Sequence, residues 1–271
     1  MISKTLRGSE GGRLGLIEAG AGAPLVLLHG VGMCAAAWAP QIEAFAPARH
    51  VFALDLPGHG GTDMLPGAPL LPDYVAWAAA AIRALGAGPV ALAGHSMGAL
   101  IALGVAVEHP DLLDRVALLN PVHRRDAKAR AAVLGRARDL AAGGGDPEAP
   151  LARWFGPEDA PDIRARVGGW LRAVDPLGYA RTYAAFAAGD DVYAGRLAAV
   201  RCPALVLTGA QDANSSPEMA QAIAAGLAGG RSVVVPGARH MASLTHPEAV
   251  NAELALWLGL PGDARGRGDA A

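Results

Sequence analysis

The 271-residue chain has few cysteines, few aromatic residues and little net charge. Its two cysteines, Cys34 and Cys202, are too far apart for a disulfide framework or a paired metal site. The formal net charge is −2, which does not favour nucleic acid as a partner. No apolar run approaches the roughly 18 residues that a membrane span needs, and residues 1–10 lack the apolar core of a signal peptide. We therefore expect a soluble, cytoplasmic protein that binds neither nucleic acid nor membranes.

Hydrophobic residues are abundant, at 52% of the chain, and occur as short runs between alanine-rich helical patterns. The runs are apolar throughout rather than alternating, which is typical of central strands covered on both faces. We expect strands at 14–19, 24–29, 50–55, 89–94, 115–120, 203–209 and 231–236. We expect helices at 35–46, 74–85, 97–108, 217–227 and 247–258. This alternation predicts an α/β fold with a doubly wound, mostly parallel sheet.

The strand pattern is interrupted between residues 121 and 200, where the sequence is helical and holds most of the aromatic side chains. Eighty helical residues between two strands of one sheet indicate an insertion rather than a simple crossover. We predict a core formed by residues 1–120 and 201–260, with residues 121–200 as a helical cap. The remaining residues, 261–271, have no apolar period and are predicted to be a disordered tail.

One serine lies in a glycine-bounded motif, Gly94-His95-Ser96-Met97-Gly98, between a predicted strand and a predicted helix. A strand that turns directly into a helix strains the serine backbone by about 1–3 kcal/mol, and bulky neighbours do not fit there. Such a turn exposes the Ser96 hydroxyl and directs the Met97 amide toward the same place. The motif in this context predicts a nucleophilic serine with one oxyanion donor beside it.

A serine nucleophile needs a histidine to accept its proton and a carboxylate to orient that histidine. Of the eight histidines, His240 follows the last predicted strand, at the sheet edge where ligands of open α/β sheets bind. Asp212 lies in the loop after the strand at 203–209, and we expect it to be the acid. Asp55 also ends a strand, but the glycine turn behind it indicates that its carboxylate braces local amides. We interpret the other seven histidines as structural or peripheral.

A second oxyanion donor is expected from the glycine-flanked turn that follows the strand at 24–29. In His29-Gly30-Val31-Gly32, glycines allow the backbone to approach a ligand closely, and the Val31 amide is the candidate donor. Together with the Met97 amide it forms the predicted oxyanion hole.

These motifs together resemble the α/β-hydrolase superfamily, over roughly residues 14–120 and 201–258. The resemblance implies an eight-stranded, mostly parallel sheet with an antiparallel second strand, and a helical cap over the active site. Within the superfamily, the turn leading to Met33 and Trp38 is similar to 3-oxoadipate enol-lactonases and carboxylesterases. His95 stands where meta-cleavage product hydrolases usually carry asparagine. Ser96 stands where epoxide hydrolases and haloalkane dehalogenases carry aspartate.

The function that we expect is hydrolysis of a carboxylic ester or lactone through an acyl-enzyme, a reaction that needs no metal or organic cofactor. Three alternatives stay open. They are carbon–carbon bond hydrolysis of a meta-cleavage-type diketone, cofactor-free haloperoxidase or perhydrolase chemistry, and a ligand receptor without turnover. The partner is a small-molecule substrate, and a homo-oligomer is compatible with the sequence.

The predicted substrate site lies beside the catalytic loops and under the cap. We expect substrate contacts from Met33, Trp38, Trp154, Tyr183 and Met241. These side chains favour a small to medium, mainly apolar substrate. Arg124 and Arg125 are interpreted as a solvated helix face, with a bidentate contact to a substrate carboxylate as the alternative.

Overall fold

The computed structural model describes residues 2–7, 12–156 and 160–260. Their strands form one eight-stranded sheet in the order β1-β2-β4-β3-β5-β6-β7-β8. Strand β2 pairs antiparallel with both β1 and β4, whereas all other neighbouring strands are parallel. The strands are β1 (Ile2–Arg7), β2 (Arg13–Ala19), β3 (Pro24–Leu28), β4 (His50–Leu54), β5 (Val90–His95), β6 (Leu113–Leu119), β7 (Ala204–Gly209) and β8 (Gly230–Val235).

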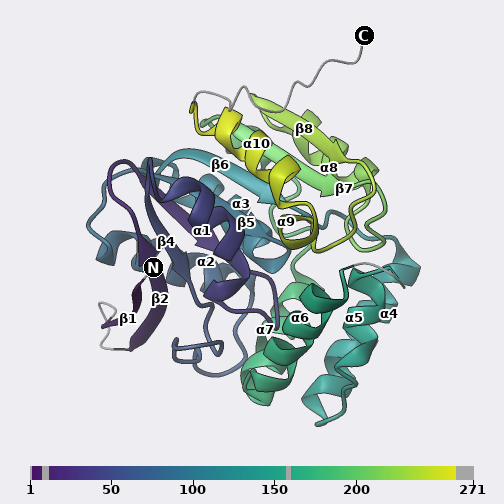
Figure 1. The fold of residues 1–271 in the computed structure, drawn as a ribbon. Helices are drawn as coiled ribbons and strands as arrows, with labels where there is room; N and C mark the ends of the chain where they lie inside the picture. The colour runs from purple at the N-terminus through teal and green to yellow at the C-terminus, as the bar shows by residue number, and fades with distance from the viewer. Residues whose placement is uncertain (1, 8–11, 157–159, 261–271) are drawn as a thin grey trace.

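Helices cover both faces of the sheet, which explains why its central strands are apolar throughout (Figure 1). Side chains of α1 (Ala39–Phe45) and α10 (Pro247–Trp257) pack in the core on one face. Those of α2 (Leu71–Ala84), α3 (Met97–Glu108) and α8 (Pro217–Gly226) pack in the core on the other. The predicted sheet with helices on both faces is confirmed.

Four helices stand between β6 and β7 and form a group beside one end of the sheet (Figure 1). They are α4 (Ala127–Ala141), α5 (Glu148–Trp154), α6 (Pro161–Ala173) and α7 (Pro176–Ala188), followed by the short 3-10 helix η3 (Leu197–Ala199). No strand occurs among the described residues of this insertion. The predicted helical insertion is therefore present, and the tail predicted at 261–271 lies outside the described residues.

Two elements differ from the sequence prediction. Strand β1 was not predicted because Ile-Ser-Lys-Thr-Leu-Arg is largely polar, as suits an exposed edge strand held by backbone pairing with β2. The single helix expected at 35–46 is divided into the 3-10 helix η1 (Ala35–Trp38) and α1, which begins at Ala39 and carries Pro40 in its first turn, where proline is favoured. Two further short helices are η2 (Pro110–Leu112) and α9 (Ala242–Thr245). None of the described helices is long and apolar enough to cross a membrane.

Candidate active site

Ser96 occupies a strained turn between β5 and α3. Its backbone angles are φ 55° and ψ −112°, in a region that a residue with a side chain rarely adopts. A methyl group on Gly94 would overlap the Gly98 carbonyl, and a methyl group on Gly98 would overlap the Leu28 carbonyl. Both glycines are therefore needed for the tight packing of this turn against β3, and every residue from Met97 to Val107 of α3 is buried behind it.

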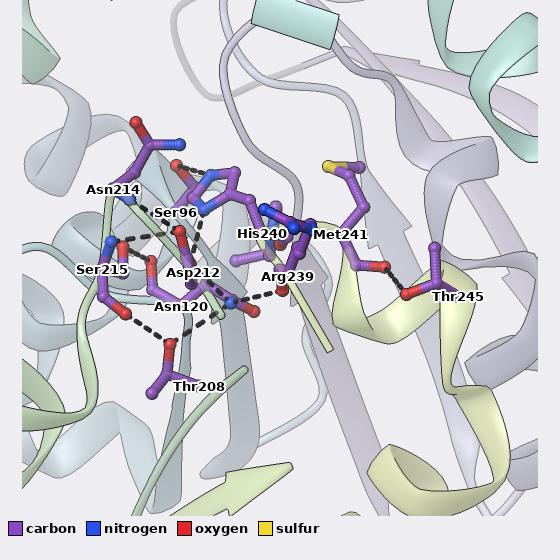
Figure 2. A network of polar contacts seen from close by, with 11 residues as sticks. Ser96, Asn120, Thr208, Asp212, Asn214, Ser215, Arg239, His240, Met241 and Thr245 are labelled. Atoms are coloured by element: carbon purple, nitrogen blue, oxygen red, sulfur yellow. Dashed lines mark hydrogen bonds and ion pairs between the residues drawn. The ribbon is translucent and has the colours of Figure 1, made fainter. Parts of the chain in front are cut away.

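The structure brings together the three side chains that the sequence singled out from distant loops (Figure 2). His240 Nε2 lies 3.1 Å from Ser96 Oγ, and His240 Nδ1 lies 2.8 Å from Asp212 Oδ2. All three side chains are buried. With Nδ1 protonated toward Asp212, the free Nε2 lone pair can accept the Ser96 proton. The hydrogen bonds form one continuous line from carboxylate to hydroxyl.

Asp212 is held as an anion by donors on both of its oxygens. Oδ2 accepts a hydrogen bond from Asn120 Nδ2 at 2.8 Å, and Oδ1 accepts from the backbone amides of Asn214 and Ser215 (Figure 2). Burial acts to raise the pKa of Asp212, but the charge of His240 and the hydrogen bonds from His240, Asn120 and Asn214 outweigh it and lower the pKa below its usual value. A charged carboxylate is the form that orients a histidine.

His240 is positioned by contacts on its backbone and on its ring. His95 Nε2 donates a hydrogen bond to the His240 carbonyl oxygen at 2.8 Å, which ties the loop after β8 to the end of β5. On the cap side, Trp154 stacks on the His240 imidazole with ring centroids 5.8 Å apart. The His240 side chain is thus fixed from both the core and the insertion.

The turn after β3 lies beside Ser96, because Gly30 and Val31 line the same cavity as Ser96 does. The Val31 and Met97 amides have no hydrogen-bond partner in the part of the chain that the structure describes, so both are free to bind an oxyanion. His59 Nε2 accepts the Gly32 amide proton at 3.0 Å, and His29 Nε2 accepts that of Leu56 at 2.9 Å. These two bonds hold the turn in place.

Both of these histidines are uncharged in the fold. Burial lowers the pKa of His29 to about 4 and that of His59 to about 3. Asp55 accepts the Ala35 and Gly61 amides, so it braces this region as expected and takes no part in the site.

A cavity of about 240 Å³ opens next to Ser96 and His240, between the sheet and the cap. Four of the five predicted substrate contacts line it: Met33, Trp154, Tyr183 and Met241. Trp38 does not line this cavity, so the prediction that Trp38 contacts a substrate here is wrong. Its side chain is buried in the core on the α1 face, where the short helix η1 directs it.

Three guanidinium groups also line this cavity, from Arg125, Arg136 and Arg153. The interpretation of Arg125 as part of a solvated helix face is wrong, because its side chain is buried and forms an ion pair with Asp190 at 3.3 Å. Arg124, in contrast, is exposed. Arg136 and Arg153 were not predicted, although Arg136 shares a face of α4 with the buried Val133 and Ala137. An arginine on the apolar face of a predicted helix is the signal that could have identified Arg136.

Asn120 was not predicted. It directly follows β6, with a positive φ of 49°, and its position at the carboxyl edge of the sheet is the same signal that identified Asp212. His95 was interpreted as structural, which agrees with its hydrogen bond to the His240 carbonyl oxygen. Among the described residues no group of three or more His, Cys, Asp or Glu side chains could hold a metal ion.

The sequence profile described as "Alpha/beta hydrolase family" matches residues 25–253, which includes every residue of the hydrogen-bonded line described above. The chain belongs to the alpha/beta hydrolase family. The resemblance seen in its sequence motifs is confirmed, and this alpha/beta hydrolase is a hydrolytic enzyme.

Two kinds of relative are informative. The chain is 49% identical over 259 residues to (E)-2-((N-methylformamido)methylene)succinate hydrolase of Acinetobacter baylyi, covering 95% of this chain and 98% of that protein. Among solved structures, an esterase from Thermogutta terrifontis is 26% identical with a TM-score of 0.85, covering 96% of this alpha/beta hydrolase and 98% of that chain. The enol-lactonase of Burkholderia xenovorans shares the fold, with 24% identity, a TM-score of 0.83, and coverage of 94% and 100%.

Proposed function

We propose that this alpha/beta hydrolase cleaves the carbonyl–nitrogen bond of a small N-acylated aminomethylene dicarboxylate, with Ser96 as nucleophile, His240 as general base and acid, and Asp212 as the residue that orients His240. The observation that carries the proposal is the continuous line of hydrogen bonds from Asp212 to Ser96 at the wall of a small cavity. The name of the relative that is 49% identical supports the substrate class.

In the first half of the reaction, Ser96 Oγ attacks the acyl carbon while its proton passes to His240 Nε2. The carbonyl oxygen becomes an oxyanion, which accepts hydrogen bonds from the Val31 and Met97 amides. Collapse of this intermediate breaks the bond between the acyl carbon and nitrogen, and His240 returns the proton to the leaving nitrogen. The acyl group remains on Ser96 as an ester.

In the second half, His240 takes a proton from water, and the resulting hydroxide attacks the acyl-serine. A second oxyanion occupies the same amide site. Its collapse releases the carboxylic acid and returns the proton from His240 to Ser96 Oγ. One water molecule is consumed and the enzyme is regenerated.

Ester or lactone hydrolysis is the second candidate, because in the same steps His240 can protonate a leaving oxygen and an alcohol departs in place of an amine. The likeness to the Thermogutta terrifontis esterase, at 26% identity over nearly the whole chain, supports it. The arginines in the cavity favour the anionic substrate over the mainly apolar one expected from sequence, since a buried guanidinium is best satisfied by a carboxylate.

The test is to incubate purified wild-type protein with 2-((N-methylformamido)methylene)succinate and to identify products by mass spectrometry. We expect formate to be released by the wild type and not by Ser96→Ala. Turnover of p-nitrophenyl esters or lactones with no formate release would favour the second candidate. Cleavage of a vinylogous diketone, or peroxide-dependent halogenation above ester turnover, would contradict both.

We also propose a reducing, cytoplasmic location. Cys34 and Cys202 are unpaired, and burial raises the pKa of both thiols, which keeps them protonated and unreactive. Fractionation of cells that express the tagged chain tests the location, and recovery outside the cytoplasm would contradict it.

A further inference from the structure

The cavity beside Ser96 is lined by cations and by no carboxylate. Arg136 reaches it from α4, Arg153 from α5, and Arg125 from the loop after β6, whereas no Asp or Glu belongs to its described lining. The remaining walls are largely apolar. Such a cavity places charged donors in surroundings of low dielectric, where they attract an anion strongly.

The charges of this region do not balance. Asp190 pairs with Arg125 and Arg130, and Asp191 pairs with Arg130, so two carboxylates are matched by two guanidinium groups. Arg136 donates only to the uncharged hydroxyl of Tyr183, at 2.9 Å. In the described part of the chain, neither Arg136 nor Arg153 has a carboxylate within ion-pair distance. Among the described residues, the two positive charges of Arg136 and Arg153 at the cavity therefore have no paired carboxylate.

These two charges lie close to each other and are partly removed from water. Burial lowers the pKa of Arg153, and the neighbouring charge of Arg136 lowers it further. The pKa of Arg125 is also lowered, first by burial, although Asp190 opposes the shift. Like charges that are held together without a counter-ion destabilise the fold unless an anion joins them.

Arg125 adds to this arrangement. Arg125 Nη2 is buried and has no hydrogen-bond partner among the described residues, although the same guanidinium is fixed by Asp190 and by stacking on the Phe186 ring. A buried N–H without an acceptor is unfavourable, and more so when the group is charged. Arg125 lines the cavity, but its Nη2 is covered by the protein, so Arg125 adds positive charge beside the cavity without offering this donor to a bound anion.

We propose that Arg136 and Arg153, supported by the positive charge of Arg125, form a receptor for the carboxylates of a dianionic substrate, and that this receptor directs the acyl carbonyl toward Ser96. Which bond is cleaved rests on the proposed function. The receptor itself is argued only from the charges and the positions of the residues that line the cavity. A planar guanidinium binds a carboxylate through two parallel hydrogen bonds, so it fixes orientation as well as charge.

The same arginines border a second cavity. Arg136, Arg153 and Tyr183 also line a space of about 520 Å³ among helices α4 to α7. Its lining includes two acidic residues, Asp139 and Asp146, and its third arginine, Arg172, is paired with Glu148. The second cavity therefore favours an anion less than the cavity beside Ser96, whose described lining holds no acidic residue.

The test is titration calorimetry of the full-length Ser96→Ala protein with methylenesuccinate and with its dimethyl ester. We expect the diacid to bind, the neutral diester to bind at least tenfold more weakly, and the affinity for the diacid to fall with added salt. Adding Arg136→Gln or Arg153→Gln is expected to weaken diacid binding by about ten- to a hundredfold. Arg138→Gln, an exposed arginine on the same helix outside both cavities, is the matched control and is expected to bind as the parent does.

Equal binding of diacid and diester, absent diacid binding, or equal loss in all three arginine variants would overturn the receptor. Thermal unfolding of each variant shows whether it is folded. If Arg136→Gln does not fold, Arg136→Lys is the substitute. It keeps the positive charge but lacks the planar pair of N–H donors, and it is expected to lose about tenfold in affinity for the diacid. Because Ser96→Ala cannot turn over, failure of the receptor and failure of the proposed hydrolysis are measured separately.

Discussion

The imidazole of His95 holds the backbone of His240 through a hydrogen bond of 2.8 Å from Nε2 to the carbonyl oxygen. The residue that precedes the proposed nucleophile in sequence thus positions His240, the residue that we propose activates it. Burial lowers the pKa of His95 to about 3, so the ring is neutral and acts as a fixed donor rather than as a second base. This link explains how loops 144 residues apart keep Ser96 and His240 in contact.

His95→Ala is expected to lower kcat by about a hundredfold, since a displacement of about 1 Å in a reacting group has an effect of that size. KM should change little, because His95 acts through His240. His95→Gln, whose amide can donate to the same carbonyl, is expected to restore a large part of kcat. Steady-state kinetics of the three proteins are the measurement. A rise in KM at constant kcat would contradict this positioning role.

Asp212→Asn is expected to lower kcat by about 10⁴-fold, since an amide no longer holds the His240 tautomer that accepts the Ser96 proton. The fold should persist because Asn120 and the backbone amides still contact this side chain. The control is Asp63→Asn, a carboxylate paired with Arg13 at the exposed surface. Loss of activity below tenfold in Asp212→Asn, or an equal loss in both variants, would remove Asp212 from the mechanism.

Gly98→Ala is expected to destabilise the protein by about 2–3 kcal/mol or prevent folding, because the added methyl meets the Leu28 and His29 carbonyls. Gly135→Ala, in open space within α4, should instead stabilise by about 0.5–1 kcal/mol. Urea unfolding of both variants provides the comparison. Equal stability of Gly98→Ala and the wild type would show that the turn is looser than described.

Stability is expected to fall as the pH drops from about 6.5 toward 4. In the unfolded chain a histidine has a pKa near 6.5, whereas burial lowers the pKa of His29 to about 4 and those of His59 and His95 to about 3. Below pH 6.5 the unfolded state therefore binds more protons, and each histidine removes up to about 1.4 kcal/mol per pH unit.

Urea unfolding at pH 7.5, 6.5 and 5.0 tests this dependence. We expect the free energy of unfolding to be highest at or above pH 6.5 and to decline steeply by pH 5. His95→Gln should reduce the slope by about one bound proton. A free energy of unfolding that stays constant between pH 6.5 and 5.0 would contradict the prediction.

The fold was largely predictable because buried elements have a recognisable local sequence pattern. The central strands are covered on both faces and appear as continuous apolar runs, and the Gly94 and Gly98 positions reflect backbone contacts that no side chain tolerates. Strand β1 has no such pattern, since this edge strand is held by backbone pairing with β2 rather than by burial of its own apolar residues. Pro40 is the sequence signal for a helix start within 35–46, because proline is favoured in the first turn of a helix.

The candidate site was predictable where chemistry and loop position coincide, as for Ser96, Asp212 and His240. It was not predictable where a side chain depends on tertiary packing. Trp38 turns into the core instead of the cavity, and Arg125 is drawn inward by Asp190, 65 residues away. Contacts between residues so far apart in sequence leave no periodic pattern in the sequence.

Active-site labelling with a fluorophosphonate, followed by peptide mass spectrometry, tests whether Ser96 is the nucleophile. We expect a single covalent adduct on Ser96, which forms much more slowly in His240→Ala and is absent in Ser96→Ala. An adduct on another residue, or undiminished labelling of Ser96→Ala, would contradict it.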